Sequence, residues 1–156
     1  MCDSGHIRLD GDVIRYRSST FGDWDLCVAD IRIIGESTDQ SGPVLDDYFF
    51  CFASGPEMWL EASFYAAGRE EFLLALRDRL GSPLELDLQR STDFNSRVLW
   101  PPSLAGEPMF QYTDLPAKSF LHKLVGLTEN QQTYTDRVAA LLATDIYPVP
   151  VRQGIK

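Results

Sequence analysis

Residues 58–81 read Met-Trp-Leu-Glu-Ala-Ser-Phe-Tyr-Ala-Ala-Gly-Arg-Glu-Glu-Phe-Leu-Leu-Ala-Leu-Arg-Asp-Arg-Leu-Gly, and the chain is organised around them. Leu60, Ala62 and Phe64 alternate with polar or amphipathic residues, which predicts a half-buried strand. From residue 69 onward, apolar side chains recur at steps of three and four, which predicts an amphipathic helix over 69–80. The apolar stripe consists of Phe72, Leu73, Ala75, Leu76 and Leu80.

The ends of this helix carry the residues that helix ends favour. Glu70 and Glu71 fall in the first turn, where the positive end of the helix dipole stabilises acids. Arg77 and Arg79 fall in the last turn, and Gly81 supplies a left-handed stop. A helix with one apolar stripe needs a surface to cover, and the aromatic strands before it are that surface.

The length of the chain, 156 residues, indicates one domain spanning residues 1–156. With 44% hydrophobic and 24% charged residues, the composition is that of an ordinary globular domain, and no apolar run reaches the length of a membrane span. Cys2, Cys27 and Cys51 are too few for a disulfide framework, and the last two lie in apolar runs where reduced thiols act as small core residues. The start has no signal-peptide pattern, so we expect a cytoplasmic protein.

The formal net charge of −9 is uneven. Residues 1–83 hold 15 acids and 7 bases, whereas residues 84–156 hold 8 acids and 7 bases. A negative field over the first half repels nucleic acid and anionic lipid and attracts basic partners. The alternative is that the charge serves solubility alone.

The first half of the chain, before residue 84, is predicted to consist mainly of strands. Asp10-Gly11 between two alternating runs predicts a hairpin within residues 6–19. Residues 24–36 form the longest predicted strand, residues 36–43 a loop, and residues 47–54 an aromatic strand apolar on both faces, which suggests a central position. The prediction is an antiparallel meander sheet or partial barrel, covered by helix 69–80.

The second half, residues 84–146, adds short strands and two helices. Leu84, Leu86 and Leu88 alternate with polar residues and predict a strand with an acidic outer face. Residues 97–100 and 109–113 are further short strands, separated by a proline-rich loop. Helices are predicted at 116–125 and at 129–143, the latter opened by Thr128 and Gln131 as a capping box and carrying a stripe of Tyr134, Val138, Leu141 and Leu142. Residues 147–156 are an extended tail.

The order of the predicted strands and helix in residues 6–81 resembles that of the bacterial pleckstrin-homology-like (PH-like) superfold. The matching features are the opening hairpin, the phrase Leu26-Cys27-Val28-Ala29-Asp30-Ile31-Arg32-Ile33-Ile34, two aromatic strands, and a helix carrying Phe72, Leu73 and Leu76. The resemblance implies a sheet-plus-helix core that acts as a binding module. Residues 18–25 lack the basic loop with which some members grip phosphoinositides, and no functional residue is carried over.

Acids gather in the predicted loops. Asp23 with Asp25 and Asp46 with Asp47 form two pairs, and Glu57 lies at another turn. Carboxylates bind hard cations, but the spacing matches no dedicated metal loop, and the simplest interpretation is solvated turn residues. We therefore expect no metal site and no cofactor, and treat the four aspartates as candidates for partner binding.

A pocket is the alternative site. The aromatic residues Trp24, Trp59, Trp100, Tyr48, Phe49, Phe50 and Phe52 either line a ligand cavity or fill the core. Asp30, Arg32 and His122 would be the polar groups of such a cavity. His6, the other histidine, has no nearby zinc-ligand set, since zinc requires three or four ligands.

Three functional hypotheses follow. The first is a non-enzymatic binding module whose acidic surface engages a basic protein partner, as an inhibitor or immunity protein would. The second is a small-molecule-binding protein or enzyme with an aromatic-lined cavity. The third is dimerisation through helix 129–143. No nucleophile elbow, phosphate loop or basic nucleic-acid-binding patch is present in the sequence.

Overall fold

The computed structural model describes residues 2–42, 45–88, 94–114 and 130–144. Within these ranges the strands are β1 His6–Asp10, β2 Val13–Arg17, β3 Trp24–Cys27, β4 Ile33–Thr38, β5 Tyr48–Ala53, β6 Trp59–Ser63, β7 Asn95–Trp100, β8 Phe110–Asp114 and β9 Asn130–Tyr134. The helices are the 3₁₀ turn η1 Val28–Asp30, α1 Arg69–Leu80 and α3 Asp136–Leu142.

The described strands form three antiparallel sheets, which confirms the α+β class. The first sheet has the order β1-β2-β3, the second β6-β5-β4-β7, and β8 pairs with β9 as a ribbon. The expected single meander is therefore divided, and no sheet among the described residues closes into a barrel. The aromatic strand β5 is central, as predicted, and all six of its residues are buried.

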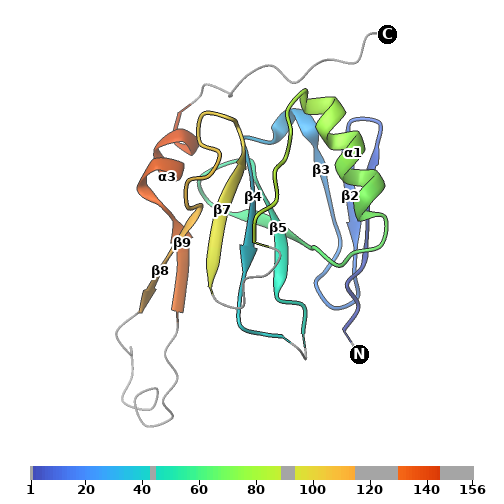
Figure 1. Ribbon diagram of the computed structural model, residues 1–156, viewed down its shortest axis with the longest axis horizontal. Coiled ribbons are helices and arrows are strands. Elements are labelled where there is room, and N and C mark those ends of the chain that lie inside the picture. The colour runs from blue at the N-terminus through green and yellow to red at the C-terminus, as the bar shows by residue number, and fades with distance from the viewer. Residues whose placement is uncertain (1, 43–44, 89–93, 115–129, 145–156) are drawn as a thin grey trace.

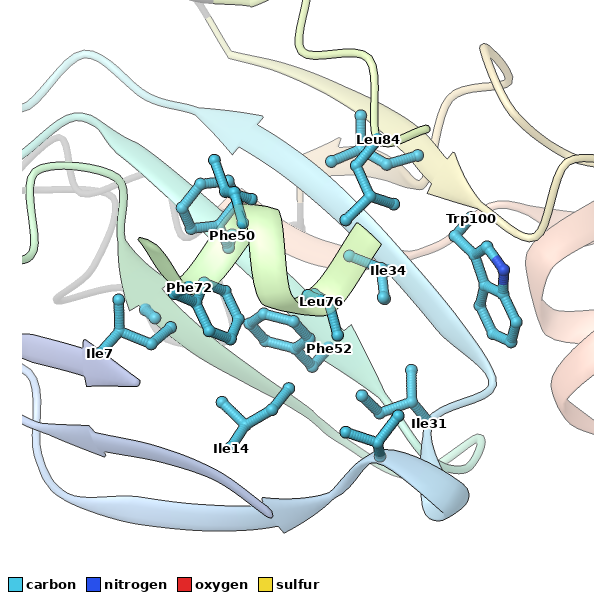
Figure 2. Close-up of a cluster of buried hydrophobic side chains, with 14 of the residues drawn as sticks. Ile7, Ile14, Ile31, Ile34, Phe50, Phe52, Phe72, Leu76, Leu84 and Trp100 are labelled. Carbon is cyan, nitrogen blue, oxygen red and sulfur yellow. The ribbon is translucent and has the colours of Figure 1, made fainter. Parts of the chain in front are cut away.

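One face of the four-stranded sheet meets α1 and the three-stranded sheet (Figure 1). The apolar side chains between them form what we call the first cluster. It includes Ile7, Ile14, Ile34, Phe50, Phe52, Phe72, Leu73, Leu76 and Leu80. Figure 2 shows Phe72 and Leu76 of α1 pointing toward the same space as Phe52 and Ile14 from the two sheets.

The opposite face of the four-stranded sheet meets the β8–β9 ribbon and α3 (Figure 1). The apolar side chains there form the second cluster. It includes Ile33, Cys51, Ala53, Val98, Leu104, Met109, Phe110, Val138 and Leu142. The sheet is thus covered on both sides, which explains why β5 is apolar on both faces.

Two elements predicted from short-range signals, helix 69–80 and the hairpin at Asp10-Gly11, are confirmed. Helix α1 spans residues 69–80 as expected, and Gly81 has a φ of +63° and donates its N–H to the carbonyls of Arg77 and Asp78. The hairpin of β1 and β2 turns at Gly11, which has a φ of +61°. Of the predicted helix stripe, only Ala75 is exposed.

The prediction of one long strand over residues 24–36 is wrong. The chain leaves the first sheet after Cys27, turns through η1, and enters the second sheet at Ile33. The Val28 N–H donates to the Asp12 carbonyl at 2.8 Å, so the turn is anchored on the hairpin instead of on a ladder. Within β3, Trp24 and Leu26 are half-buried while Asp25 and Cys27 are exposed, so Cys27 is not the core thiol expected, whereas Cys51 is buried.

Two predictions around Glu36 also fail. Residues 36–38 belong to β4 and not to a loop, because β4 pairs along its length with both β5 and β7. Residues 84–88 form no strand. Leu84 is buried as the alternation predicts, but the backbone N–H groups of Asp87 and Leu88 donate to the Glu36 carboxylate instead of to a neighbouring strand.

The predicted helix over 129–143 is half wrong. Residues 130–134 form β9, which pairs with β8 in a register from Phe110↔Tyr134 to Asp114↔Asn130, and the helix begins only at Asp136. Ladder pairing with a strand distant in sequence overrides the local capping pattern. The short strands near 97–100 and 109–113 are confirmed as β7 and β8. Helix 116–125, His122 and the tail 147–156 lie outside the described residues.

Candidate binding surface

The end of β6 and the start of β5 bring Asp46 and Asp47 beside the residues that lead into α1. Because β5 and β6 are antiparallel, with Phe49 opposite Ser63, the segment before β5 meets the segment after β6. The Ser63 hydroxyl donates to Asp46 Oδ2 at 2.5 Å, and the Tyr65 hydroxyl donates to Asp47 Oδ1 at 2.9 Å. This predicted pair therefore has fixed neighbours.

Tyr65 is an exposed aromatic residue within an acidic setting. Its relative exposure is 49%, high for a large amphipathic ring. Partial burial, followed by the hydrogen bond to Asp47 and the charge of Asp46, raises the pKa of Tyr65 to about 12. The phenol therefore stays protonated at neutral pH and continues to donate to Asp47.

A hollow of about 530 Å³ lies next to Tyr65, at the start of α1. The lining residues are His6, Tyr65, Ala66, Gly68, Arg69, Glu70 and Glu71. Two backbone hydrogen bonds hold the chain beside it, since the Ile7 N–H donates to the Ala67 carbonyl and the Ala67 N–H donates to the Gly5 carbonyl. Gly68 has a φ of +81°, and a Cβ there would lie 2.7 Å from the Ile7 oxygen, so only glycine fits this approach.

We call the group Asp46, Asp47, Tyr65, Glu70 and Glu71 the Tyr65 surface. Arg69, which follows Gly68 at the start of α1, has its guanidinium engaged with Phe64 and Glu70. The Arg69 guanidinium lies 4.1 Å from the Phe64 ring centroid, donates to the Phe64 carbonyl at 2.9 Å, and is 3.8 Å from Glu70. Among the described residues, no arginine or lysine forms an ion pair with Asp46 or Asp47.

The other predicted pair, Asp23 and Asp25, has a different setting. Asp25 lies 2.8 Å from Arg17 and 2.9 Å from Arg15, and the hydrogen bond from Arg17 lowers the pKa of Asp25. Asp23 accepts the Ser18 N–H at 3.0 Å and shapes the turn between β2 and β3. The charge of Asp25 is thus compensated within the sheet, while Asp46 and Asp47 have no arginine or lysine partner in the part of the chain that the structure describes. Glu57 is exposed in the turn before β6.

Asp30 and Arg32, the two predicted pocket residues within the described part of the chain, lie in different settings. Arg32 is buried and donates to the last carbonyls of α3, at 2.5 Å to Leu142 and 2.6 Å to Leu141, and also to Thr144. Asp30 is exposed in η1. Arg32 therefore fixes the end of α3, where a cation complements the helix dipole.

The aromatic residues contact one another. Trp24 packs on Tyr16 and Phe52 at 5.6 and 5.5 Å between ring centroids, and Tyr48 stacks on Phe64 at 4.2 Å.

A second hollow, of about 210 Å³, lies between residues 82–85 and β7. It is lined by Ser82, Pro83, Glu85, Arg97, Val98, Leu99, Pro102 and Ala105, and thus by none of these aromatic residues. In the described ranges, no three Asp, Glu, His or Cys side chains are grouped to hold a metal ion.

Two acids of the four-stranded sheet were not singled out in the sequence, namely Glu36, which is buried, and Glu61, which is half-buried. Glu36 is fully buried, with its oxygens facing the Tyr48 hydroxyl, two backbone N–H groups and Arg97 at 3.7 Å. Among the described residues, the Glu61 carboxylate accepts one hydrogen bond, from the Trp59 indole at 2.8 Å, while its backbone carbonyl accepts the Trp24 indole N–H. For Glu61 the available signal was an acid between Leu60 and Ala62 in an alternating run, whereas Glu36 stands between Gly35 and Ser37 and the sequence around it carries no such signal. Tyr65 was detectable as an aromatic residue at an outward-facing position of the predicted strand, although in the structure it follows β6.

Comparison with known proteins gives no match: no family model, no curated protein and no solved structure is significantly similar to this chain. The fold and the surfaces are therefore the basis for a functional proposal. No helix in the described ranges has both the length and the apolar character needed to span a membrane.

Proposed function

We propose that this chain is a non-enzymatic binding module that engages a basic protein partner through the Tyr65 surface. The observation that carries the proposal is the contrast in charge compensation. Asp46 and Asp47 have no described cationic partner and border an exposed tyrosine, whereas Asp25 is paired with two arginines.

The chemistry of such a surface suits an arginine-bearing partner. A guanidinium binds a carboxylate through two parallel hydrogen bonds and also stacks on an aromatic face. Tyr65 offers a ring next to Asp47, and the adjoining hollow is bordered by Glu70 and Glu71. Tyrosine paired with partner arginine is a common centre of binding energy in protein interfaces.

The PH-like resemblance remains part of this proposal. It is supported by the order of strands β1 to β6 followed by α1, with α1 packed over both sheets. An inhibitor or immunity-type role accords with an acidic surface of this kind, by analogy of charge alone.

Native mass spectrometry of the protein purified from its own cells at low salt tests the proposal. We expect a co-purifying basic protein that dissociates as ionic strength rises, because salt screens exposed charge pairs. The double variant Asp46→Asn/Asp47→Asn should lose that protein. Each asparagine keeps an oxygen to accept the Ser63 or Tyr65 hydroxyl, so the local structure is preserved.

The matched control is Glu57→Gln/Asp78→Asn, which changes the net charge equally at exposed positions away from this surface. The control should retain the partner. A loss of equal size in both variants would show that total charge, and not the Tyr65 surface, governs binding. A protein that carries no basic partner at low salt would contradict the proposal outright.

A further inference from the structure

Strand β6 places an acid and an indole side by side on the face of the second cluster. Trp59 and Glu61 are two residues apart and share that face, and the Trp59 Nε1–H donates to Glu61 Oε1 at 2.8 Å. In the ladder, Glu61 lies directly opposite Cys51, which is fully buried. The Glu61 carboxyl therefore lies at the margin of an apolar layer.

The β8–β9 ribbon packs on the same indole. The Trp59 ring lies 4.5 Å from the Phe110 ring and 5.2 Å from the Tyr134 ring, measured between centroids. The Tyr134 hydroxyl donates to the Met58 carbonyl at 2.9 Å, just before β6. Trp59 is thus the direct connection between Glu61 and the ribbon.

The groups around Glu61 do not favour its negative charge. Asp39, in the loop after β4, adds a second negative charge, and the neighbouring group on β5 is the Cys51 thiol. On β9, the Tyr134 hydroxyl donates its hydrogen bond to the Met58 carbonyl and not to Glu61. Among the described residues, no cation forms an ion pair with Glu61. Burial has the largest influence and raises the pKa of Glu61. The hydrogen bond from Trp59 acts in the opposite direction and has a smaller effect.

The geometry links Glu61 to the ribbon through Trp59. The indole donates to the Glu61 carboxyl from within β6, and its ring contacts Phe110 and Tyr134 of the ribbon. Detachment of the ribbon would expose the Trp59–Glu61 pair to water, which favours the ionised carboxylate. We propose that protonation of Glu61 strengthens, and ionisation of Glu61 weakens, the packing of the β8–β9 ribbon on β6, so that this contact responds to pH.

The direction follows from proton linkage. With the pKa of Glu61 raised in the packed state, that state binds more protons than the open state at pH values above the ordinary glutamate pKa. Packing is then strongest at or below the ordinary value of 4.5 and weakens as pH rises through the raised pKa. One proton changes the opening equilibrium by at most about tenfold per pH unit.

Native-state hydrogen exchange tests this inference. Exchange of residues 109–114 and 130–135 would be measured between about pH 5 and about pH 8 and divided by the intrinsic rate at each pH. We expect the opening constant of this ribbon to rise with pH in the wild-type chain. Strand β5, at the centre of the sheet, should show no comparable rise.

Glu61→Gln is the decisive variant, because glutamine keeps an oxygen for the Trp59 N–H and cannot ionise. It should fold and show a ribbon opening constant independent of pH. Glu57→Gln, an exposed acid four residues earlier, should behave as wild type. A wild-type ribbon whose corrected exchange does not vary with pH, or a Glu61→Gln variant that retains the wild-type slope, would overturn the inference.

Discussion

Each face of the four-stranded sheet holds one acid in a different setting, with Glu36 buried on the α1 face and Glu61 half-buried on the ribbon face. On the α1 face, Glu36 is surrounded by a hydroxyl, two backbone N–H groups and an arginine. On the ribbon face, Glu61 has one indole donor and a raised pKa. A buried charge stabilises a fold only when its partners compensate its desolvation. Glu36 therefore has more compensating partners than Glu61, and we expect the α1 face to be the more stable of the two.

The largest expected effect comes from Phe72→Ala on the α1 face. Phe72 is 2% exposed and packs edge-on against Phe52 at 6.3 Å, so the change should lower the free energy of unfolding by about 3–5 kcal/mol. Urea denaturation measures the loss. Leu142→Ala on the ribbon face is the comparison. If it removed hydrogen-exchange protection from β5 as fully as Phe72→Ala does, the distinction between the faces would fail.

Glu36→Ala should cost about 3 kcal/mol, because it leaves the Tyr48 hydroxyl, two N–H groups and Arg97 facing a site without an acceptor. Chemical denaturation gives the loss in stability, and exchange at Asp87 and Leu88 should increase. Glu36→Gln, which retains one acceptor oxygen, should recover part of the loss. Equal stability of the alanine variant and the wild type would show that the hydrogen bonds to Glu36 make no net contribution to the free energy of unfolding.

Gly35→Ala tests the ribbon face sterically. A Cβ on Gly35 would lie 2.2 Å from Met109 Sδ and 3.0 Å from the Arg97 carbonyl, so the methionine must move. We expect a loss of about 1–3 kcal/mol, the usual cost of overpacking. Thermal unfolding measures it. The double variant Gly35→Ala/Met109→Ala should relieve the clash, and a lack of any relief would place the strain at the Arg97 backbone.

The smallest effect is expected from Glu61→Gln. At about pH 8 the variant should be slightly more stable than wild type, because it avoids the cost of a buried negative charge, and near the ordinary glutamate pKa the two should be alike. Urea unfolding at both pH values measures the difference. A variant less stable than wild type at the higher pH would mean that the charge-assisted bond to Trp59 outweighs desolvation.

Prediction from the sequence succeeded where the decisive interactions are close in the chain. Helix α1 was bounded correctly because the apolar spacing, Glu70, Glu71 and Gly81 act within one segment. The hairpin at Gly11 and the central strand β5 were found for the same reason. These elements form most of the first cluster, so the α1 face was foreseeable.

The failures share a cause. Residues 24–36 alternate well enough for one strand, but the hydrogen bond from Val28 to Asp12 and the change of sheet depend on the hairpin's position. Residues 130–134 form a strand because β8 is available, which no local pattern reveals. Asp46 and Asp47 were recognised as candidates, yet their difference from Asp25 lies in arginines that only strand pairing places.

The sequence by itself determined the α+β class, the acidic balance, helix α1 with both of its ends, and the aromatic central strand, because each depends on composition or on neighbours within a few residues. Only the tertiary structure decided how the sheets divide, which acids are compensated and which face Glu36 and Glu61 each occupy. Those outcomes depend on contacts between residues far apart in the chain, such as Glu36 with Asp87 or Arg32 with Leu142, and a one-dimensional pattern carries no record of them.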